Sequence, residues 1–307
     1  MPESPKHLPL SPEDRRRRRR QRFRRRGKRA YIRSVYFLPS LATLGNAICG
    51  FGSMYVASLY VGPAGLEAIT DPWTRSFTTH SFTWAAYLIF IAMIFDALDG
   101  RLARLTRHTT DFGGQLDSLA DVISFGAAPA FLALQIFKTS GYQLDYTISR
   151  AIWAVGAVYM SCAALRLARF NVSNEHGEQH HYSFLGLPSP GAGGAVAAFV
   201  LMLEQLRGDH FFKLAEIGVW ILPVLVLGTG LLMVSEIRYP HIVNRYLRGR
   251  RSIMQLVIFV GLLLLLITKP RYTLGLSLLA YVLWGIWLWG HGRIVHIQET
   301  RRREAAK

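Results

Sequence analysis

The sequence is poor in charged residues for its length and contains only two cysteines. Asp, Glu, Lys and Arg make up 18% of its 307 residues, whereas 51% are hydrophobic. Long stretches almost without charge exclude an ordinary soluble domain and leave room for several membrane spans. Cys49 and Cys162 lie in apolar runs without C-x-x-C spacing, so we interpret them as packing residues, with neither a disulfide nor a metal site. The chain opens polar and then basic, without the apolar core and cleavage site of a signal peptide.

Apolar runs of near-spanning length predict an all-α integral membrane protein with about eight transmembrane helices. The expected spans are residues 36–61, 82–107, 114–138, 151–170, 187–206, 217–237, 253–269 and 272–291. The fifth of these is rich in Gly and Ala, which is typical of tightly packed membrane helices. Pro129 is expected to kink the third span, and the pair Gly113–Gly114 is expected to mark the turn before it.

Four aspartates flank the junction between the second and third expected spans. On helices, one group of small and acidic residues follows the spacing i, i+3, i+4, i+7 and a second group follows i, i+4, i+8. The groups are Asp96, Asp99, Gly100 and Ala103, and Gly113, Asp117 and Asp121. Four carboxylates pooled beside lipid cannot all stay ionised without a positive partner. Helix capping or snorkelling explains one such residue but not four, and carboxylate oxygens favour Mg²⁺ or Mn²⁺ over Zn²⁺.

The same stretch resembles the signature of the CDP-alcohol phosphotransferases, which are integral membrane enzymes of phospholipid synthesis. The pattern D-x2-D-G-x2-A-R-x8-G-x3-D-x3-D is matched at Asp96, Asp99, Gly100, Ala103, Arg104, Gly113, Asp117 and Asp121. The resemblance implies a six-helix core, a homodimer and two divalent ions, Mg²⁺ or Mn²⁺. It implies that the four aspartates bind the ions, with Asp121 also the general base. By the same resemblance, the site residues that contact CDP-diacylglycerol are Gly100, Ala103, Arg104 and Gly113.

Four further segments resemble bacterial phosphatidylserine synthases: LPSLATLGNAICGF, RLARFN, GLPSP and SEIRYP. They imply transfer of the phosphatidyl group from CDP-diacylglycerol to the hydroxyl of L-serine, with phosphatidylserine and CMP as products. Inositol phosphate, glycerol phosphate and choline stay open as acceptors.

These segments supply further candidate site residues. Thr43 and Asn46 are candidates for contacts with CDP, and Arg166, Arg169 and Asn171 are candidates for binding the acceptor. The plainer explanations are close helix packing for the first pair and anchoring of the helix end for the arginines.

Basic residues predict the orientation in the membrane. With eight spans and the N-terminus inside, 29 of the 36 Lys and Arg lie on the cytoplasmic side, together with the aspartates. We therefore expect a multi-pass protein of the cell (inner) membrane with a cytoplasmic active site. The Arg-rich tail, residues 1–35, is expected to be disordered and attracted to anionic lipids. The alternative is that the tail serves only as a topology signal. The net charge of +17 thus does not indicate nucleic-acid binding.

The expected organisation has four parts: the tail, a catalytic core at 36–237, two additional helices at 238–291 and a charged C-terminal tail at 292–307. A divalent-cation transporter is the alternative from another class, because acids within membranes also mark ion pathways. Transporters more often show internal repeats and polar groups near mid-membrane. Here no repeat is evident, and the acids cluster at one edge beside an arginine.

Overall fold

Glycine and alanine dominate the central helix of the molecule, α8 (Ser189–Gly208), and let its neighbours approach closely. A Cβ atom added at Gly193 would lie 3.2 Å from the Cα atom of Phe125, and one at Gly194 would lie 3.1 Å from the sulfur of Met93. This confirms the tight packing expected from the composition of this span. The structure, a computed structural model, describes residues 40–106, 111–140, 146–175, 184–239 and 253–305.

Nearly all of the described chain is helical. Besides α8, the helical elements are residues 40–58, α2 (Pro63–Leu66), α3 (Pro72–Thr79), α4 (Ser81–Thr106), α5 (Asp111–Asp121), η1 (Val122–Ala127), α6 (Ala128–Thr139), α7 (Tyr146–Glu175), α9 (Phe212–Val234), α11 (Ile253–Thr268) and α12 (Pro270–Ala305). Two short strands, β1 (Phe184–Leu185) and β2 (Arg238–Tyr239), pair antiparallel.

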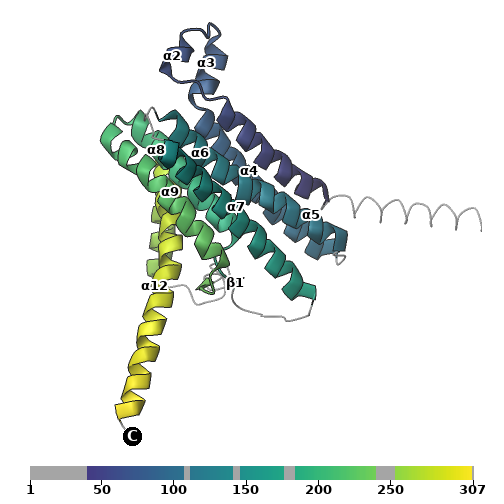
Figure 1. Ribbon diagram of the computed structural model, residues 1–307, viewed down its shortest axis with the longest axis vertical. Coiled ribbons are helices and arrows are strands. Elements are labelled where there is room, and N and C mark those ends of the chain that lie inside the picture. The colour runs from purple at the N-terminus through teal and green to yellow at the C-terminus, as the bar shows by residue number, and fades with distance from the viewer. Residues whose placement is uncertain (1–39, 107–110, 141–145, 176–183, 240–252, 306–307) are drawn as a thin grey trace, which may run out of the picture.

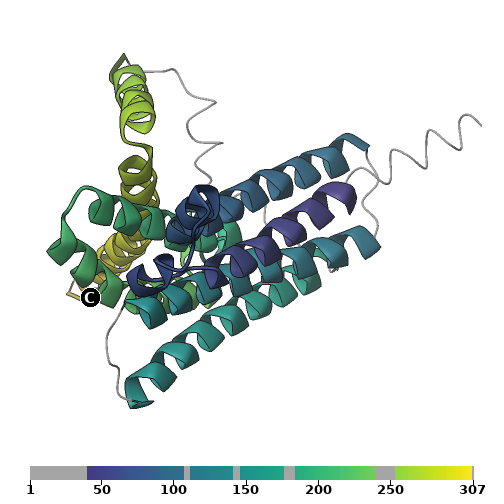
Figure 2. The ribbon, with the colours of Figure 1, turned by 90° about the horizontal axis from the view of Figure 1, so that it is seen from above.

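The long helices form a bundle in which successive helices run in opposite directions (Figure 1). Helix α8 packs against α4, α9 and α12, and α7 packs along α9. Seen from above in Figure 2, the helix at residues 40–58 lies beside α4 and the α5–α6 rod. The alternating directions bring the start of the first helix, the end of α4, the start of α5 and the end of α7 to one end of the bundle. We call this end the acidic end.

In the part of the chain that the structure describes, five helical segments are long and apolar enough to cross a membrane: Ser81–Leu102, Phe112–Thr139, Tyr146–Val172, Phe212–Val234 and Pro270–Gly290. The other three expected spans correspond to residues 40–58, α8 and α11.

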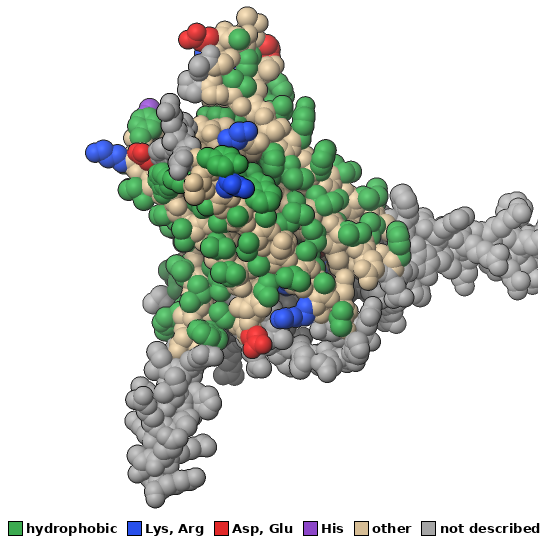
Figure 3. Space-filling view, in the orientation of Figure 1, with side chains coloured by type: hydrophobic (Ala, Val, Ile, Leu, Met, Phe, Trp, Pro, Cys, Tyr) green, Lys and Arg blue, Asp and Glu red, His purple; other side chains and the backbone are tan. Residues whose placement is uncertain are grey.

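The flank of the bundle is apolar, and Figure 3 shows hydrophobic side chains covering it while charged side chains lie toward the two ends. Ile48, Val224 and Ile267 are each at least 70% exposed, which would be costly in water but suits a surface in lipid. The predicted fold class, an all-α multi-pass membrane protein, is confirmed.

A π-helical turn joins α5 to α6 directly after Asp121. In this turn the N–H of Ala128 bonds to the carbonyl of Ile123, five residues back. Pro129 has no N–H to give to the carbonyl of Phe125, and the hydroxyl of Tyr159 on α7 donates to that carbonyl at 3.0 Å instead. The irregularity expected at Pro129 therefore takes the form of a π-helix, a feature often found at functional sites.

The expected turn at Gly113–Gly114 is wrong, because both glycines lie inside α5, which begins at Asp111. The connection itself falls at residues 107–110, outside the described residues. Glycine is indispensable elsewhere: Gly186 has φ of 80°, and its N–H bonds to the carbonyl of Ile237 at 2.9 Å beside the β1–β2 pair. This link ties the chain before α8 to the chain after α9.

Candidate active site

Three aspartates from two helices meet at the acidic end. Asp96 comes from α4, and Asp117 and Asp121 come from α5; one carboxylate oxygen from each lies within 4.8 Å of the others. Asp96 and Asp117 are half-buried, and Asp121 is only 7% exposed. The i, i+4 spacing of Asp117 and Asp121 places both on one face of α5, and the carboxylates of both lie near that of Asp96 on α4. The predicted pooling of carboxylates is thus observed for these three.

Asp99, the fourth predicted ligand, lies near the same three residues but has a partner of its own. The hydroxyl of Thr43, on the helix at residues 40–58, donates a hydrogen bond to Oδ2 of Asp99. Both side chains are buried. Asp99 is close enough to Asp96 and Asp117 for their negative charges to repel. A cation among these side chains would relieve that repulsion.

Asn46, one turn after Thr43, holds the other deeply buried carboxylate. Its Nδ2 donates to Oδ1 of Asp121 at 3.0 Å, and its backbone carbonyl accepts from the hydroxyl of Ser124 at 2.8 Å. The first helix can approach this closely because residue 50 is glycine: a Cβ there would lie 2.6 Å from the Cα of Ser124. Thr43 and Asn46 therefore orient aspartates, and their expected contacts with CDP stay a prediction.

Arg166 on α7 brings a positive charge to the cluster. It interacts electrostatically with Asp96 and Asp121. Its Nη1 donates to the hydroxyl of Ser189 at 2.5 Å, while its buried Nε has no hydrogen-bond partner among the described residues. A buried donor without a hydrogen bond costs about 1–3 kcal/mol of stability. The guanidinium of Arg166 is therefore suited to binding an anionic ligand.

The other two candidates for acceptor binding on α7 differ in their surroundings. Nδ2 of Asn171 donates to the hydroxyl of Ser118 at 2.9 Å, which links the end of α7 to α5 next to Asp117. Arg169 is exposed. Of the three candidates, Arg166 thus lies beside the aspartates and Arg169 lies at the surface. Asn171 bonds to Ser118, the residue that follows Asp117 in the chain.

The candidates for CDP-diacylglycerol binding are only partly described. Gly100 is exposed at the end of α4, and a Cβ there would meet nothing within 4 Å, so a ligand can reach the backbone. Gly113 is half-buried in the first turn of α5. The side chains of Ala103 and Arg104 lie outside the described residues, as does the tail at 1–35.

The donor set favours a hard divalent cation. Among the described residues, only carboxylate oxygens converge here, without histidine or cysteine, and such ligands suit Mg²⁺ or Mn²⁺. The cluster sits at the end of two membrane helices, where unneutralised charge is expensive. The residues therefore fit a divalent metal.

Fold and site together define a multi-pass membrane protein with an acidic cation site at one end of its helices. The sequence model of the CDP-alcohol phosphatidyltransferase family matches residues 36–231. The chain belongs to this family, whose members are metal-dependent phosphotransferases. Helices α11 and α12 lie beyond the matched residues.

Three similar proteins, from three organisms, carry the same name. The chain is 32% identical over 258 residues to a CDP-diacylglycerol--serine O-phosphatidyltransferase of Helicobacter pylori, covering 84% of this chain and 93% of that protein. A protein of the same name from Methanocaldococcus jannaschii is 35% identical over 65% of this chain and 81% of its own length. One from Bacillus subtilis is 29% identical over 67% of this chain and 90% of its own.

Proposed function

We propose that this protein transfers the phosphatidyl group of CDP-diacylglycerol to the hydroxyl of L-serine, giving phosphatidylserine and CMP. The observation that carries the proposal is the convergence of Asp96, Asp117 and Asp121 beside Arg166 in a chain of this family. The shared name of its relatives supports serine as the acceptor.

The aspartate cluster is proposed to receive the pyrophosphate of CDP-diacylglycerol. Asp96, Asp99, Asp117 and Asp121 would hold two divalent ions, Mg²⁺ or Mn²⁺. When bound, these ions neutralise the pyrophosphate and polarise the phosphorus that is transferred. Gly100 leaves the end of α4 open for the close approach of a phosphate. Arg104, in the same signature, would add positive charge where CMP departs.

Asp121 is proposed as the general base. Its Oδ1 accepts from Asn46, which fixes the carboxylate and leaves Oδ2 to take the proton of the serine hydroxyl. The serine oxygen then bonds to the phosphorus that carries the diacylglycerol. The bond from this phosphorus to the CMP oxygen breaks, and CMP leaves with the bonding electron pair. Water has limited access, because Asp121 is buried between the first helix and the start of η1.

Arg166 is proposed to bind the carboxylate of serine. Its unpartnered Nε and its position beside Asp121 would bring the serine hydroxyl close to the base. Asn171 and Arg169 complete the proposed acceptor site on the last two turns of α7. Choline lacks a carboxylate and would gain nothing from this guanidinium.

We further propose that the acidic end faces the cytoplasm at the inner membrane, because 29 of the 36 Lys and Arg would then lie inside. The catalytic core would be residues 36–237, with 238–291 as two additional helices. A homodimer, and a tail at 1–35 drawn to anionic lipid, complete this proposal.

The test is CMP release by the purified protein in detergent–lipid micelles. The assay contains CDP-diacylglycerol, Mn²⁺ or Mg²⁺ and labelled serine, with inositol phosphate, glycerol phosphate and choline in parallel. We expect CMP release that requires serine, and label in the lipid product. Release that requires another alcohol would overturn serine as the acceptor, and cation flux without CMP release would overturn the enzymatic function.

A further inference from the structure

Helix α12 lies outside the residues matched by the family model, yet it reaches the neighbourhood of the acceptor site. It packs along α8, and its Tyr281 is half-buried against the start of that helix. A Cβ atom added at Gly191 would lie 3.5 Å from Cε1 of Tyr281. The ring of Tyr281 therefore lies against the first turn of α8.

The same turn of α8 holds Arg166. Ser189, the first residue of α8, is fully buried and accepts the hydrogen bond from Nη1 of Arg166. Arg166 also lies close enough to Tyr281 for the positive charge of its guanidinium to act on the phenol oxygen. The guanidinium is thus contacted by α8 and lies near the phenol of α12, while the aspartates attract it from α4 and α5.

We propose that Tyr281 is a positioning residue for Arg166 and thereby sets the affinity of the enzyme for the carboxylate of its acceptor. The inference rests on the proposed function, because it assigns Tyr281 to the site in which Arg166 binds serine. It gives α12 a role in substrate recognition in addition to its packing in the membrane.

The physical reason is the freedom of an arginine side chain. A long arginine side chain has considerable rotamer entropy, and part of this entropy is lost whenever a ligand must be bound in one geometry. Among the described residues, Ser189 holds only one nitrogen of the guanidinium, while Asp96 and Asp121 attract the group toward the metal site. A phenol oxygen on the α12 side would hold the group in place before serine arrives.

The decisive variant is Tyr281→Phe, which keeps the ring and its packing but removes the hydroxyl. We expect the KM for serine to rise about five- to tenfold, the effect of one hydrogen bond. The kcat and the KM for CDP-diacylglycerol should change less than twofold. The matched control is Tyr272→Phe on the same helix, whose hydroxyl donates to Asp209 at 2.9 Å at the opposite end. It should leave the KM for serine unchanged.

A double-mutant cycle with Arg166→Lys separates positioning from packing. If Tyr281 acts through Arg166, removing its hydroxyl should have no further effect on the KM for serine once the guanidinium is gone. An unchanged KM in Tyr281→Phe, an equal loss in Tyr272→Phe, or full additivity in the cycle would each overturn the inference.

The acceptor panel keeps this test distinct from that of the proposed function. If the wild-type protein releases CMP with another anionic alcohol instead, the assignment of serine as the acceptor is wrong. The same rise in the KM for that alcohol in Tyr281→Phe would still support the positioning role of Tyr281. If no alcohol releases CMP, the proposed function fails, and the inference about Tyr281 fails with it.

Discussion

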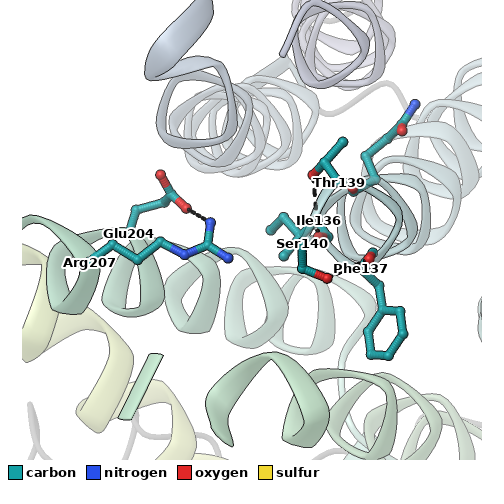
Figure 4. Close-up of polar contacts among 7 residues, drawn as sticks. Ile136, Phe137, Thr139, Ser140, Glu204 and Arg207 are labelled. Atoms are coloured by element: carbon teal, nitrogen blue, oxygen red, sulfur yellow. Dashed lines mark hydrogen bonds and ion pairs between the residues drawn. The ribbon is translucent and has the colours of Figure 1, made fainter. Parts of the chain in front are cut away.

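The two ends of the bundle differ in how their charged side chains are paired. At the end opposite the aspartates, polar side chains satisfy one another: Glu204 and Arg207 form an ion pair at 2.8 Å, shown in Figure 4. Asp209 accepts from Gln205 and from Tyr272, both at 2.9 Å. These contacts fasten the end of α8 to itself and to the start of α12.

At the acidic end, Asp96, Asp117 and Asp121 bring carboxylate oxygens within 4.8 Å of one another, and Asp99 lies close enough to Asp96 and Asp117 to repel them. Thr43 and Asn46 are neutral donors that orient Asp99 and Asp121 without cancelling their charge, and Arg166 supplies one positive charge near Asp96 and Asp121. The charged side chains at the opposite end are therefore paired with one another. The acidic end keeps an excess of negative charge that a ligand must balance. This imbalance is what marks the acidic end as the functional one.

The largest effect is expected for Asp121→Asn. The amide cannot take the serine proton, so kcat should fall about 10²- to 10⁴-fold, the range for loss of a general base. Binding of CDP-diacylglycerol should be largely retained, and CMP release under saturating substrates measures the change. Near-normal turnover would refute the role of Asp121 as the base and remove the main chemical difference between the two ends.

A smaller loss is expected for Asn46→Ala, which removes the donor that orients Asp121. Residues that support metal ligands typically affect activity or metal affinity about 10–100-fold when they are replaced. The concentration of Mn²⁺ needed for half-maximal CMP release should rise accordingly. If Asn46 instead contacts only the nucleotide, the KM for CDP-diacylglycerol would rise and the Mn²⁺ dependence would stay as in the wild type.

The smallest effect is expected at the opposite end and concerns pH. The hydroxyl of Tyr272, followed by the amide of Gln205, lowers the pKa of Asp209 below its ordinary value. A lowered carboxyl pKa gives stability that is present above the unfolded pKa and is lost as pH falls through the folded pKa. Tyr272→Phe should therefore lower the thermal midpoint at neutral pH, and the difference from wild type should vanish in acid. A difference independent of pH would contradict this assignment.

The local part of the site could be predicted from the sequence. Asp96, Asp117 and Asp121 follow helical spacing on either side of a short connection, so their convergence required only two helices to meet there. The expected spans also fall on helices, because length and apolarity are properties of a continuous segment.

The remaining features depend on contacts between residues far apart in the chain. Thr43 and Asp99 are separated by 56 positions, and Asn46 and Asp121 by 75, so no local pattern indicates that they bond. Within the π-helix after Asp121, the carbonyl of Phe125 accepts from the hydroxyl of Tyr159, which lies 34 positions further along the chain. Pro129 in the sequence indicates an irregular helix, but it does not indicate that the irregularity is a π-helical turn.

The central claim is that the aspartates of α4 and α5 share divalent cations, and a crystal soaked in Mn²⁺ tests it most directly. An anomalous difference map should show manganese between Asp96, Asp117 and Asp121, and Asp117→Asn should weaken or abolish that peak. A map with no manganese among these carboxylates, in crystals of protein that is active with Mn²⁺, would contradict the account.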